Sequence, residues 1–339
     1  MLEIDGSKGE GGGQLLRCTV ALSAVTGKEV RISNIRAKRP SPGLAPQHLA
    51  AVRGVASLSS ASVEGASAGS KELTFRPGRI SGGALRVDVG TAGSISLVLQ
   101  ACLLPSVRAE TRTTIDISGG TNVRWSPPID YYRLVLLPLL RRMGVEIGLQ
   151  IEGRGFFPEG GGRVRAFVEP AESLSPIDLR ERGDFVSIEG VCFSQNLPEH
   201  VCTRMAHSVR RAFVSEGKIV ITAAHSTGRS TGAGVCLCAE YEWALLGADA
   251  LGERGMPSEK VGEEAAARLR REMASGGTLD VHASDQLLPY MALSGERSSF
   301  RVREVTEHLR TQMWLISEFL GTSFETSAIP GGFEIEVRP

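Results

Sequence analysis

The sequence predicts an α/β fold of the α+β type, in which a large domain is interrupted by a smaller inserted α/β domain. Short runs of alternating apolar residues, typical of strands, recur along the chain and are separated by stretches with helical patterning. A linker-like segment at residues 172–176 precedes a separate series of strands and helices. At 339 residues the chain is long enough for two domains of unequal size.

The first half of the chain alternates helices with short strands. Residues 15–25 are nearly all apolar, and residues 46–58 begin with a proline, which suits the first turn of a helix. Residues 94–104 are apolar almost all round, so we expect this helix to be buried. Residues 131–143 end in arginines and are followed by a glycine, a typical helix stop. Alternating apolar residues predict strands at 30–32, 85–89, 145–151, 164–168 and 333–337.

Residues 185–277 form the predicted inserted domain, and residues 1–184 with 278–339 form the large domain. In the inserted part we expect strands at 186–191, 218–222 and 234–238 and helices at 198–216, 240–251 and 263–274. The large domain then resumes with a strand at 279–282, a helix, and a long final helix at 302–320.

Composition excludes several classes of protein. The 38 basic and 38 acidic side chains balance, which argues against coating nucleic acid by bulk charge. A hydrophobic share of 42% excludes disorder as the main character. The apolar runs fall far short of the roughly 18 to 20 residues of a membrane span, and the N-terminus lacks a secretory signal. Six scattered cysteines suit reduced thiols, so we expect a cytoplasmic protein. The sequence leaves the oligomeric state open.

The first glycine cluster, Gly9-Glu10-Gly11-Gly12-Gly13-Gln14, lies just before the first helix. Successive glycines let the backbone approach a ligand and direct amides at an anion. The cluster does not fit the phosphate-binding loop that ends in Gly-Lys-Ser/Thr. A carboxylate here would suit a divalent cation that bridges to phosphate. The alternative is a glycine-rich turn between a strand and a helix.

A basic loop follows the first expected strand. Arg36, Lys38 and Arg39 precede a helix whose first turn contains Gln47 and His48. A helix N-terminus combined with arginines is an anion site, which Arg17 could join. The alternative is a solvated basic loop.

A second glycine cluster, Arg154 to Val164, lies between two expected strands, so its simplest interpretation is a hairpin tip. It shares Glu-Gly-Gly-Gly with residues 10–13, which hints at an internally duplicated unit. On the final helix, His308 lies at the edge of an apolar stripe, where a structural role is the alternative to chemistry. The histidines and cysteines form no zinc pattern.

The motifs together resemble those of the RNA 3'-terminal phosphate cyclases. Arg154-Gly155-x-x-Pro158-x-Gly160-Gly161-Gly162-x-Val164 resembles that family's signature, and Gly9 to Arg17 resembles its N-terminal motif. The resemblance runs in order from about residue 3 to the end. It also includes Arg36-x-x-Arg39 through Gln47-His48, the helix around Gln100, Asp285-Gln286-Leu287-Leu288-Pro289 and the helix of His308.

The resemblance implies repeated βαβ-type units in the large domain and ATP-dependent conversion of an RNA 3'-phosphate to a 2',3'-cyclic phosphodiester. It implies a covalent histidine–AMP intermediate and then an RNA-adenylate, with release of pyrophosphate and AMP. By position, His308 would be the nucleophile and Glu10 the ligand of Mg²⁺ or Mn²⁺. Residues near the nucleotide would be Gln100, Pro158, His282, Asp285 and Gln286, and those around the phosphates and RNA end Arg17, Arg36, Arg39, Gln47 and His48.

Two departures from the family pattern concern this site. His282 stands where relatives often have a tyrosine near the adenine, and Gln312 stands where asparagine is usual. An imidazole can also stack on a base, and neither change removes His308.

Three alternatives remain. The first is a non-catalytic relative that acts in ribosome assembly, against which the presence of both His308 and Glu10 argues. The second is a nucleotidyl-transfer enzyme acting on other polynucleotide ends, which would share the histidine. The third is an enolpyruvyl transferase, against which the motif at 154–164 argues.

Overall fold

The computed structural model describes residues 1–339 and contains three copies of one unit. Each unit runs strand, helix, strand, helix, strand, strand, and its sheet has the order first, second, fourth, third: β1-β2-β4-β3, β5-β6-β8-β7 and β9-β14-β16-β15. The first two strands of each unit pair in parallel and the last two are antiparallel. The predicted α+β fold of repeated units is confirmed.

The first unit comprises β1 (Leu2–Asp5), α1 (Gly13–Thr26), β2 (Val30–Ser33), α2 (Pro46–Leu58), β3 (Ser62–Glu64) and β4 (Leu73–Arg76). The second comprises β5 (Gly83–Asp88), α3 (Ile95–Val107), β6 (Thr113–Gly119), a helical segment, β7 (Ile147–Gly153) and β8 (Gly162–Val168). That segment is α4 (Ile129–Tyr131), the π-helical η1 (Tyr132–Leu136) and α5 (Leu137–Arg142). The third comprises β9 (Asp178–Leu179), α8 (Val281–Leu293), β14 (Ser298–Val302), α9 (Glu307–Leu320), β15 (Ser323–Ile329) and β16 (Gly332–Arg338).

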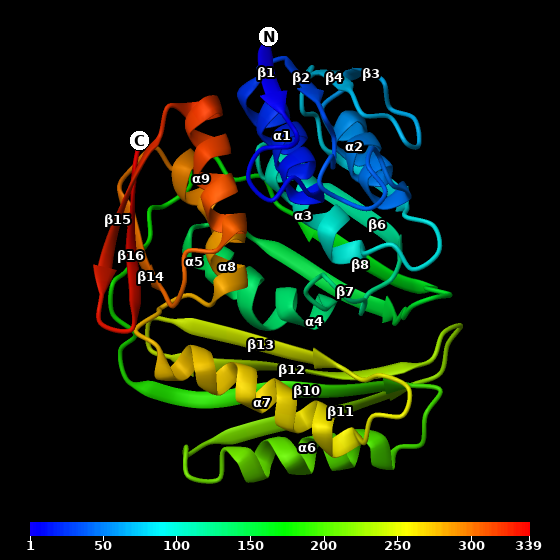
Figure 1. Cartoon of the computed structure of the whole chain (residues 1–339), viewed down its shortest axis with the longest axis vertical. Helices are drawn as coiled ribbons and strands as arrows, with labels where there is room; N and C mark the ends of the chain where they lie inside the picture. Colours follow the sequence, from blue (N-terminus) through cyan, green and yellow to red (C-terminus); the bar gives the residue numbers. More distant parts are fainter.

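The insert, defined here as residues 185–277, interrupts the third unit between β9 and α8 and lies below the rest of the chain in Figure 1. It contains β10 (Phe185–Gln195), α6 (His200–Ala212), β11 (Ile219–Ser226), β12 (Gly232–Tyr241), β13 (Leu245–Leu251) and α7 (Ser258–Ala274). In its sheet, β11-β10-β12-β13, the strands β10, β12 and β13 are largely buried on both faces, whereas the edge strand β11 buries only Ile221. Cys236 and Cys238 pack into the large core, whereas Val235 and Leu237 pack with α6 and α7. The domain boundaries at 185 and 277 stay a prediction.

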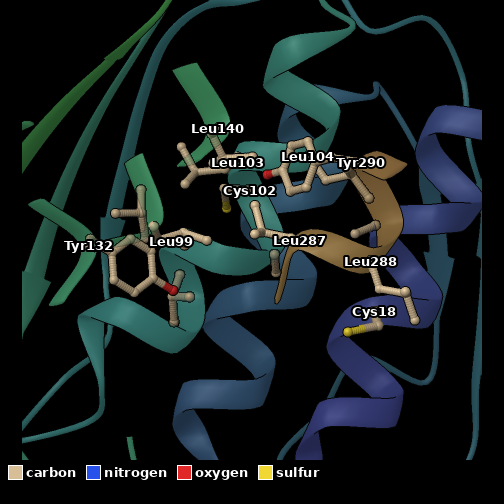
Figure 2. Packing of buried hydrophobic residues seen from close by; sticks show 14 of the residues in the cluster. Cys18, Leu99, Cys102, Leu103, Leu104, Tyr132, Leu140, Leu287, Leu288 and Tyr290 are labelled. Atoms are coloured by element: carbon tan, nitrogen blue, oxygen red, sulfur yellow. The ribbon is translucent and has the colours of Figure 1, made fainter. Parts of the chain in front are cut away.

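The main core lies where α1, α3, α8 and the η1–α5 segment meet (Figure 2). As predicted, α3 is buried almost all round, and the Tyr132 hydroxyl donates to the Ser96 carbonyl at 2.6 Å. Cys18 and Cys102 lie in this core, and burial raises the pKa of both thiols to about 12. All six cysteines are free and buried. None of the helices combines the length and the apolar character that a membrane span requires.

Three predicted elements were wrong. Residues 245–251 form strand β13 and not part of a helix, because they pair antiparallel with β12. Residues 281–282 begin helix α8 and are not a strand. The final helix begins at Glu307, capped by Thr306, because residues 298–302 form strand β14. The Glu-Gly-Gly-Gly clusters also do not mark the repeat, since one precedes a helix and the other lies between the last two strands of a unit.

The buried carboxylate of Asp280 joins three segments. It caps α8 by accepting from the amides of His282 and Ala283 at 2.9 and 3.0 Å. It also accepts from the Tyr131 hydroxyl at 2.7 Å and from the Gly247 amide of β13 at 2.7 Å. A side chain at position 247 would collide with the Tyr131 ring. Asp280 therefore fixes the start of α8 against both α4 and the insert.

Asp280→Ala is expected to destabilise the protein strongly, because it leaves the Tyr131 hydroxyl and the Gly247 amide buried without an acceptor. Orphaned groups of this kind cost about 1–3 kcal/mol each, and a lost helix cap costs about 1 kcal/mol more. We therefore expect a loss of about 3–5 kcal/mol in urea unfolding followed by circular dichroism. The matched control, Asp88→Ala at an exposed strand end, should lose less than about 1 kcal/mol. An unchanged unfolding midpoint for Asp280→Ala would contradict this role.

Candidate active site

Three helices bring their first turns to the same place. Gln14 lies at the start of α1, His308 in the first turn of α9, and Asp285 in the second turn of α8. Thr306 caps α9 by accepting from the Leu309 amide at 3.1 Å, and this cap fixes the position of His308 in the first turn. Neither α1 nor α2 begins with a side-chain cap. The first residue of α2 is Pro46, which has no N–H, and the His48 amide donates to the Ala45 carbonyl at 2.9 Å, so the uncapped amides that could bind an anion are mainly those of α1.

The Gln14 side chain connects Asp285 to His308. Its Nε2 donates to Asp285 Oδ2 at 2.8 Å, and its Oε1 lies 2.5 Å from His308 Nδ1. When Asp285 is ionised, its carboxylate can only accept from the amide nitrogen, so the amide oxygen faces the imidazole and Nδ1 carries the ring proton. This hydrogen-bond chain leaves the lone pair of His308 Nε2 free.

Glu10 lies on the other side of the imidazole. Its Oε2 is 3.0 Å from His308 Nε2, and its Oε1 forms an ion pair with Arg39. A side chain at Gly12 would meet both the Arg39 guanidinium and the Glu10 carboxylate, so the glycine leaves room for these groups to approach. The structure thus places the first glycine cluster beside the basic loop.

A positively charged pocket surrounds His48. A side chain at Gly13 would collide with the His48 ring and approach Arg17 Nη1, so these groups meet over the start of α1. Arg17 is buried, and its Nε has no hydrogen-bond partner, nor has His48 Nδ1. Arg36, which donates to the Gly43 carbonyl at 2.8 Å, has the left-handed φ of +54° that few side chains adopt. Buried donors without partners beside arginines are suited to an anionic ligand.

The charges at this site shift three pKa values. Burial, followed by the positive charge of Arg17, lowers the pKa of His308 to about 4. Burial and the charges of Arg17, Arg36 and Arg39 lower the pKa of His48 to about 3. Burial raises the pKa of the Asp285 carboxyl to about 7. Both imidazoles are therefore neutral at pH 7, the form in which a ring nitrogen can act as a nucleophile.

The remaining predicted nucleotide residues surround this centre. Gln100 and Gln286 line a small cavity behind Arg17, and Gln286 Oε1 is buried without a partner. His282 is exposed at the start of α8 and packs edge-on against Tyr131, with ring centroids 6.3 Å apart. Gln47 Oε1 accepts from the Ser94 amide at 3.2 Å and ties α2 to the next loop.

Pro158 lies apart from this cluster, in the exposed loop between β7 and β8. That loop joins the large part of the chain to the insert. Arg154 forms a buried ion pair with Asp130 at 2.5 Å and stacks over Phe193 of β10. The Phe156 amide donates to Ser230 Oγ at 2.8 Å. Arg154 and Phe156 of this motif therefore contact the joint with the insert, no contact connects Pro158 to His308, and a nucleotide role of Pro158 stays a prediction.

Sequence reasoning missed two residues. Gln14 was part of the quoted glycine motif but received no role, because its partners lie 271 and 294 residues away. Asp280 could have been found, since an aspartate before an apolar run is a typical helix N-cap signal.

The residues at Glu10 fit a divalent cation in part. Glu10 Oε2 is buried without a donor, and it faces a histidine nitrogen that also accepts, so a cation there would relieve the repulsion. Carboxylate oxygen is the ligand type that Mg²⁺ and Mn²⁺ prefer. No group of three or more His, Cys, Asp or Glu side chains is arranged to hold a metal, so substrate oxygens or waters would supply the other ligands.

The protonation of His308 can be measured directly by NMR. We expect its imidazole to remain neutral as pH falls from 8 to 5 and to protonate only near pH 4, with the proton on Nδ1 in the neutral form. Nitrogen chemical shifts report both the charge and the tautomer. Gln14→Leu should mix the two tautomers without unfolding the chain. Titration of His308 at its ordinary value of about 6.5, or an unchanged tautomer in Gln14→Leu, would contradict this arrangement.

Comparison with known proteins shows the family of this chain. Residues 8–326 match the family described as RNA 3'-terminal phosphate cyclase. A protein of that name from Archaeoglobus fulgidus is 47% identical over 322 residues, covering 95% of this chain and 96% of that protein. Proteins of the same name from Nitrosospira multiformis and Pyrococcus furiosus are each 44% identical, covering 100% and 96% of this chain and 97% and 95% of their own lengths. The chain therefore belongs to the RNA 3'-terminal phosphate cyclase family, a family of ligase-type enzymes.

Proposed function

We propose that this chain converts an RNA 3'-phosphate end to a 2',3'-cyclic phosphodiester, using ATP and a covalent AMP on His308. Besides family membership, one observation supports the proposal, and it concerns the surroundings of His308. The His308 imidazole is neutral and oriented by Gln14, and it lies beside the Arg17–His48 pocket. A non-catalytic member would have no need for such an arrangement.

In the first step, His308 Nε2 attacks the α-phosphorus of ATP. A nitrogen–phosphorus bond forms, the bond to pyrophosphate breaks, and AMP remains on the ring. Gln14 Oε1 accepts a hydrogen bond from the Nδ1–H group throughout, and this contact stabilises the positive charge that the ring carries as the bond forms. Arg17 and Arg39 are the cations that influence His308, and they would stabilise charge on the phosphate oxygens.

In the second step, an oxygen of the RNA 3'-phosphate attacks the AMP phosphorus and His308 leaves. In the third, the neighbouring 2'-hydroxyl attacks the RNA phosphorus, its proton passes to water, and the bond to AMP breaks, which releases AMP. Because this hydroxyl is already adjacent, the intramolecular advantage alone lowers the barrier by several kcal/mol, about 7–11 for ideal geometry. The chain then needs to supply mainly charge stabilisation.

We propose Mg²⁺ or Mn²⁺ at Glu10 as the resident metal. When bound, it would act as a Lewis acid toward phosphate oxygens. We also propose a cytoplasmic location, which is supported by the six free thiols.

The overall reaction is tested with an RNA oligonucleotide that ends in a 3'-phosphate. With ATP and a divalent metal, we expect an end that resists phosphatase and opens again in acid, with equal release of AMP and pyrophosphate. His308→Ala should abolish the reaction while the circular dichroism spectrum stays native, because His308 is about half exposed. An RNA with a 3'-hydroxyl end serves as the control. A folded His308→Ala variant that still cyclises ends would reject the proposal.

Substituting Arg36 in the basic loop should affect the use of RNA ends more than the reaction with ATP. Arg36→Ala is expected to weaken use of 3'-phosphate ends by about 10-fold or more, because a lost charge-assisted hydrogen bond costs about 1.5–3 kcal/mol. Formation of the AMP–protein adduct should change less, since Arg36 is not among the charges that shift the pKa of His308. The two rates are measured separately with labelled ATP and labelled RNA. Equal loss of both would show that Arg36 acts on ATP or on the fold.

A further inference from the structure

Two large aromatic side chains stand exposed on neighbouring loops. Trp125 is 95% exposed and Phe157 is 77% exposed, whereas nine of the 18 aromatic residues are buried and only one other, Trp243, is exposed. Trp125 also has a left-handed φ of +66°, which is strained for a bulky residue and is typical of functional positions. Neither burial nor backbone geometry explains a tryptophan at this position.

The two loops are bonded to one another. The amides of Thr121 and Asn122 both donate to the Gly155 carbonyl, at 2.9 and 3.0 Å, and the Gly155 amide donates to Thr121 Oγ1 at 2.9 Å. Trp125 and Phe157 therefore project from one rigid pair of loops. This pair lies at the joint with the insert, next to α4, which Figure 1 shows between the two parts of the chain.

The same loops are connected to the proposed phosphate pocket. The Pro127 carbonyl accepts from Ser96 Oγ at 2.7 Å, Ser96 Oγ lies 2.9 Å from Ser94 Oγ, and the Ser94 amide donates to Gln47 Oε1 at 3.2 Å. Gln47 precedes His48 of the pocket. A strand whose 3' end occupies the pocket would have to leave the site across one of the surrounding surfaces.

The charged side chains around Trp125 and Phe157 are of both signs, and they include two arginines that form no ion pair. Arg163 and Arg229 are exposed and form no ion pair, and Arg229 packs against Gly161 of the loop. Arg124 is paired with Glu253 of the insert, and Glu159 is exposed nearby. Exposed aromatic rings with arginines beside them are the usual means of binding unpaired bases without sequence preference.

We infer that Trp125 and Phe157 form a stacking surface for unpaired bases of the RNA strand that leads to the terminal phosphate. This inference rests on the proposed function for the identity of the ligand. According to this inference, the chain binds a polynucleotide more tightly than a short 3'-phosphorylated fragment because of the stacking surface and not because of the phosphate pocket.

The test measures binding and not turnover, by fluorescence anisotropy. The probes are a single-stranded RNA of about ten nucleotides and a dinucleotide, both with 3'-phosphates. Stacking contributes about 1–3 kcal/mol per base, so Trp125→Ala should weaken binding of the longer RNA about 5- to 100-fold and leave the dinucleotide unchanged. Phe157→Ala should act in the same direction. Trp125→Phe should restore most of the affinity, whereas Trp125→Leu should not.

Trp243→Ala is the matched control. Trp243 is also exposed, at 47%, but it lies just after the last residue of β12. The first residue of that strand, Gly232, is the one that lies against Phe156, so Trp243 is at the opposite end of β12 from the aromatic loops. This variant should bind both RNAs normally. Formation of the AMP–protein adduct is followed in parallel and should stay unchanged in every variant.

Three results would overturn the inference. The first is that Trp125→Ala binds the longer RNA as tightly as the parent chain does. The variant could lose adduct formation as well, which would place Trp125 at the ATP site. Sedimentation could show that it breaks up an oligomer, which would make the surface a contact between copies. If the parent chain binds RNA but never cyclises it, the proposed function fails while the binding result still decides this inference.

Discussion

The site depends on one buried carboxylate. Asp280 accepts hydrogen bonds from the start of α8, from Tyr131 of α4 and from Gly247 of β13, so three segments distant in sequence share one acceptor. A buried carboxylate is stable only when donors surround it, and here the free amides at a helix N-terminus supply part of that stabilisation. Because any shift of one segment would leave the carboxylate unsatisfied, the start of α8 has a single position.

The position of α8 determines the orientation of the catalytic candidate. Asp285 lies one turn after the cap, Gln14 donates to Asp285, and Gln14 accepts from His308. Each hydrogen bond fixes the direction of the next, so the free ring nitrogen is directed toward Glu10. The insert contributes one of these hydrogen bonds, from the Gly247 amide to Asp280. The segment that interrupts the third unit is therefore bonded to the residue that positions α8.

Local sequence patterns identified the main helices and the alternating strands of the repeated units, because capping and alternation are local signals. They failed at residues 245–251, whose leucines and alanines favour a helix but whose pairing with β12 requires a strand. The resemblance named Glu10, Arg17, Arg39, His48 and His308 as residues of one site, and the structure places them close together. It could not identify the role of Gln14, which exists only through contacts between distant segments. Pro158 lies apart from these residues, in a loop whose Arg154 and Phe156 bond to Asp130 and Ser230, and its nucleotide role stays a prediction.

The central claim is that His308 receives AMP through Nε2. The most direct measurement is mass spectrometry of the protein after incubation with ATP and a divalent metal, with digestion kept at basic pH to preserve a phosphoramidate. Our account predicts one adenylate, located on the peptide that contains His308 and absent when that residue is alanine. Adenylate on a lysine or another histidine, or efficient cyclisation of RNA ends with no adenylate on the protein, would contradict it.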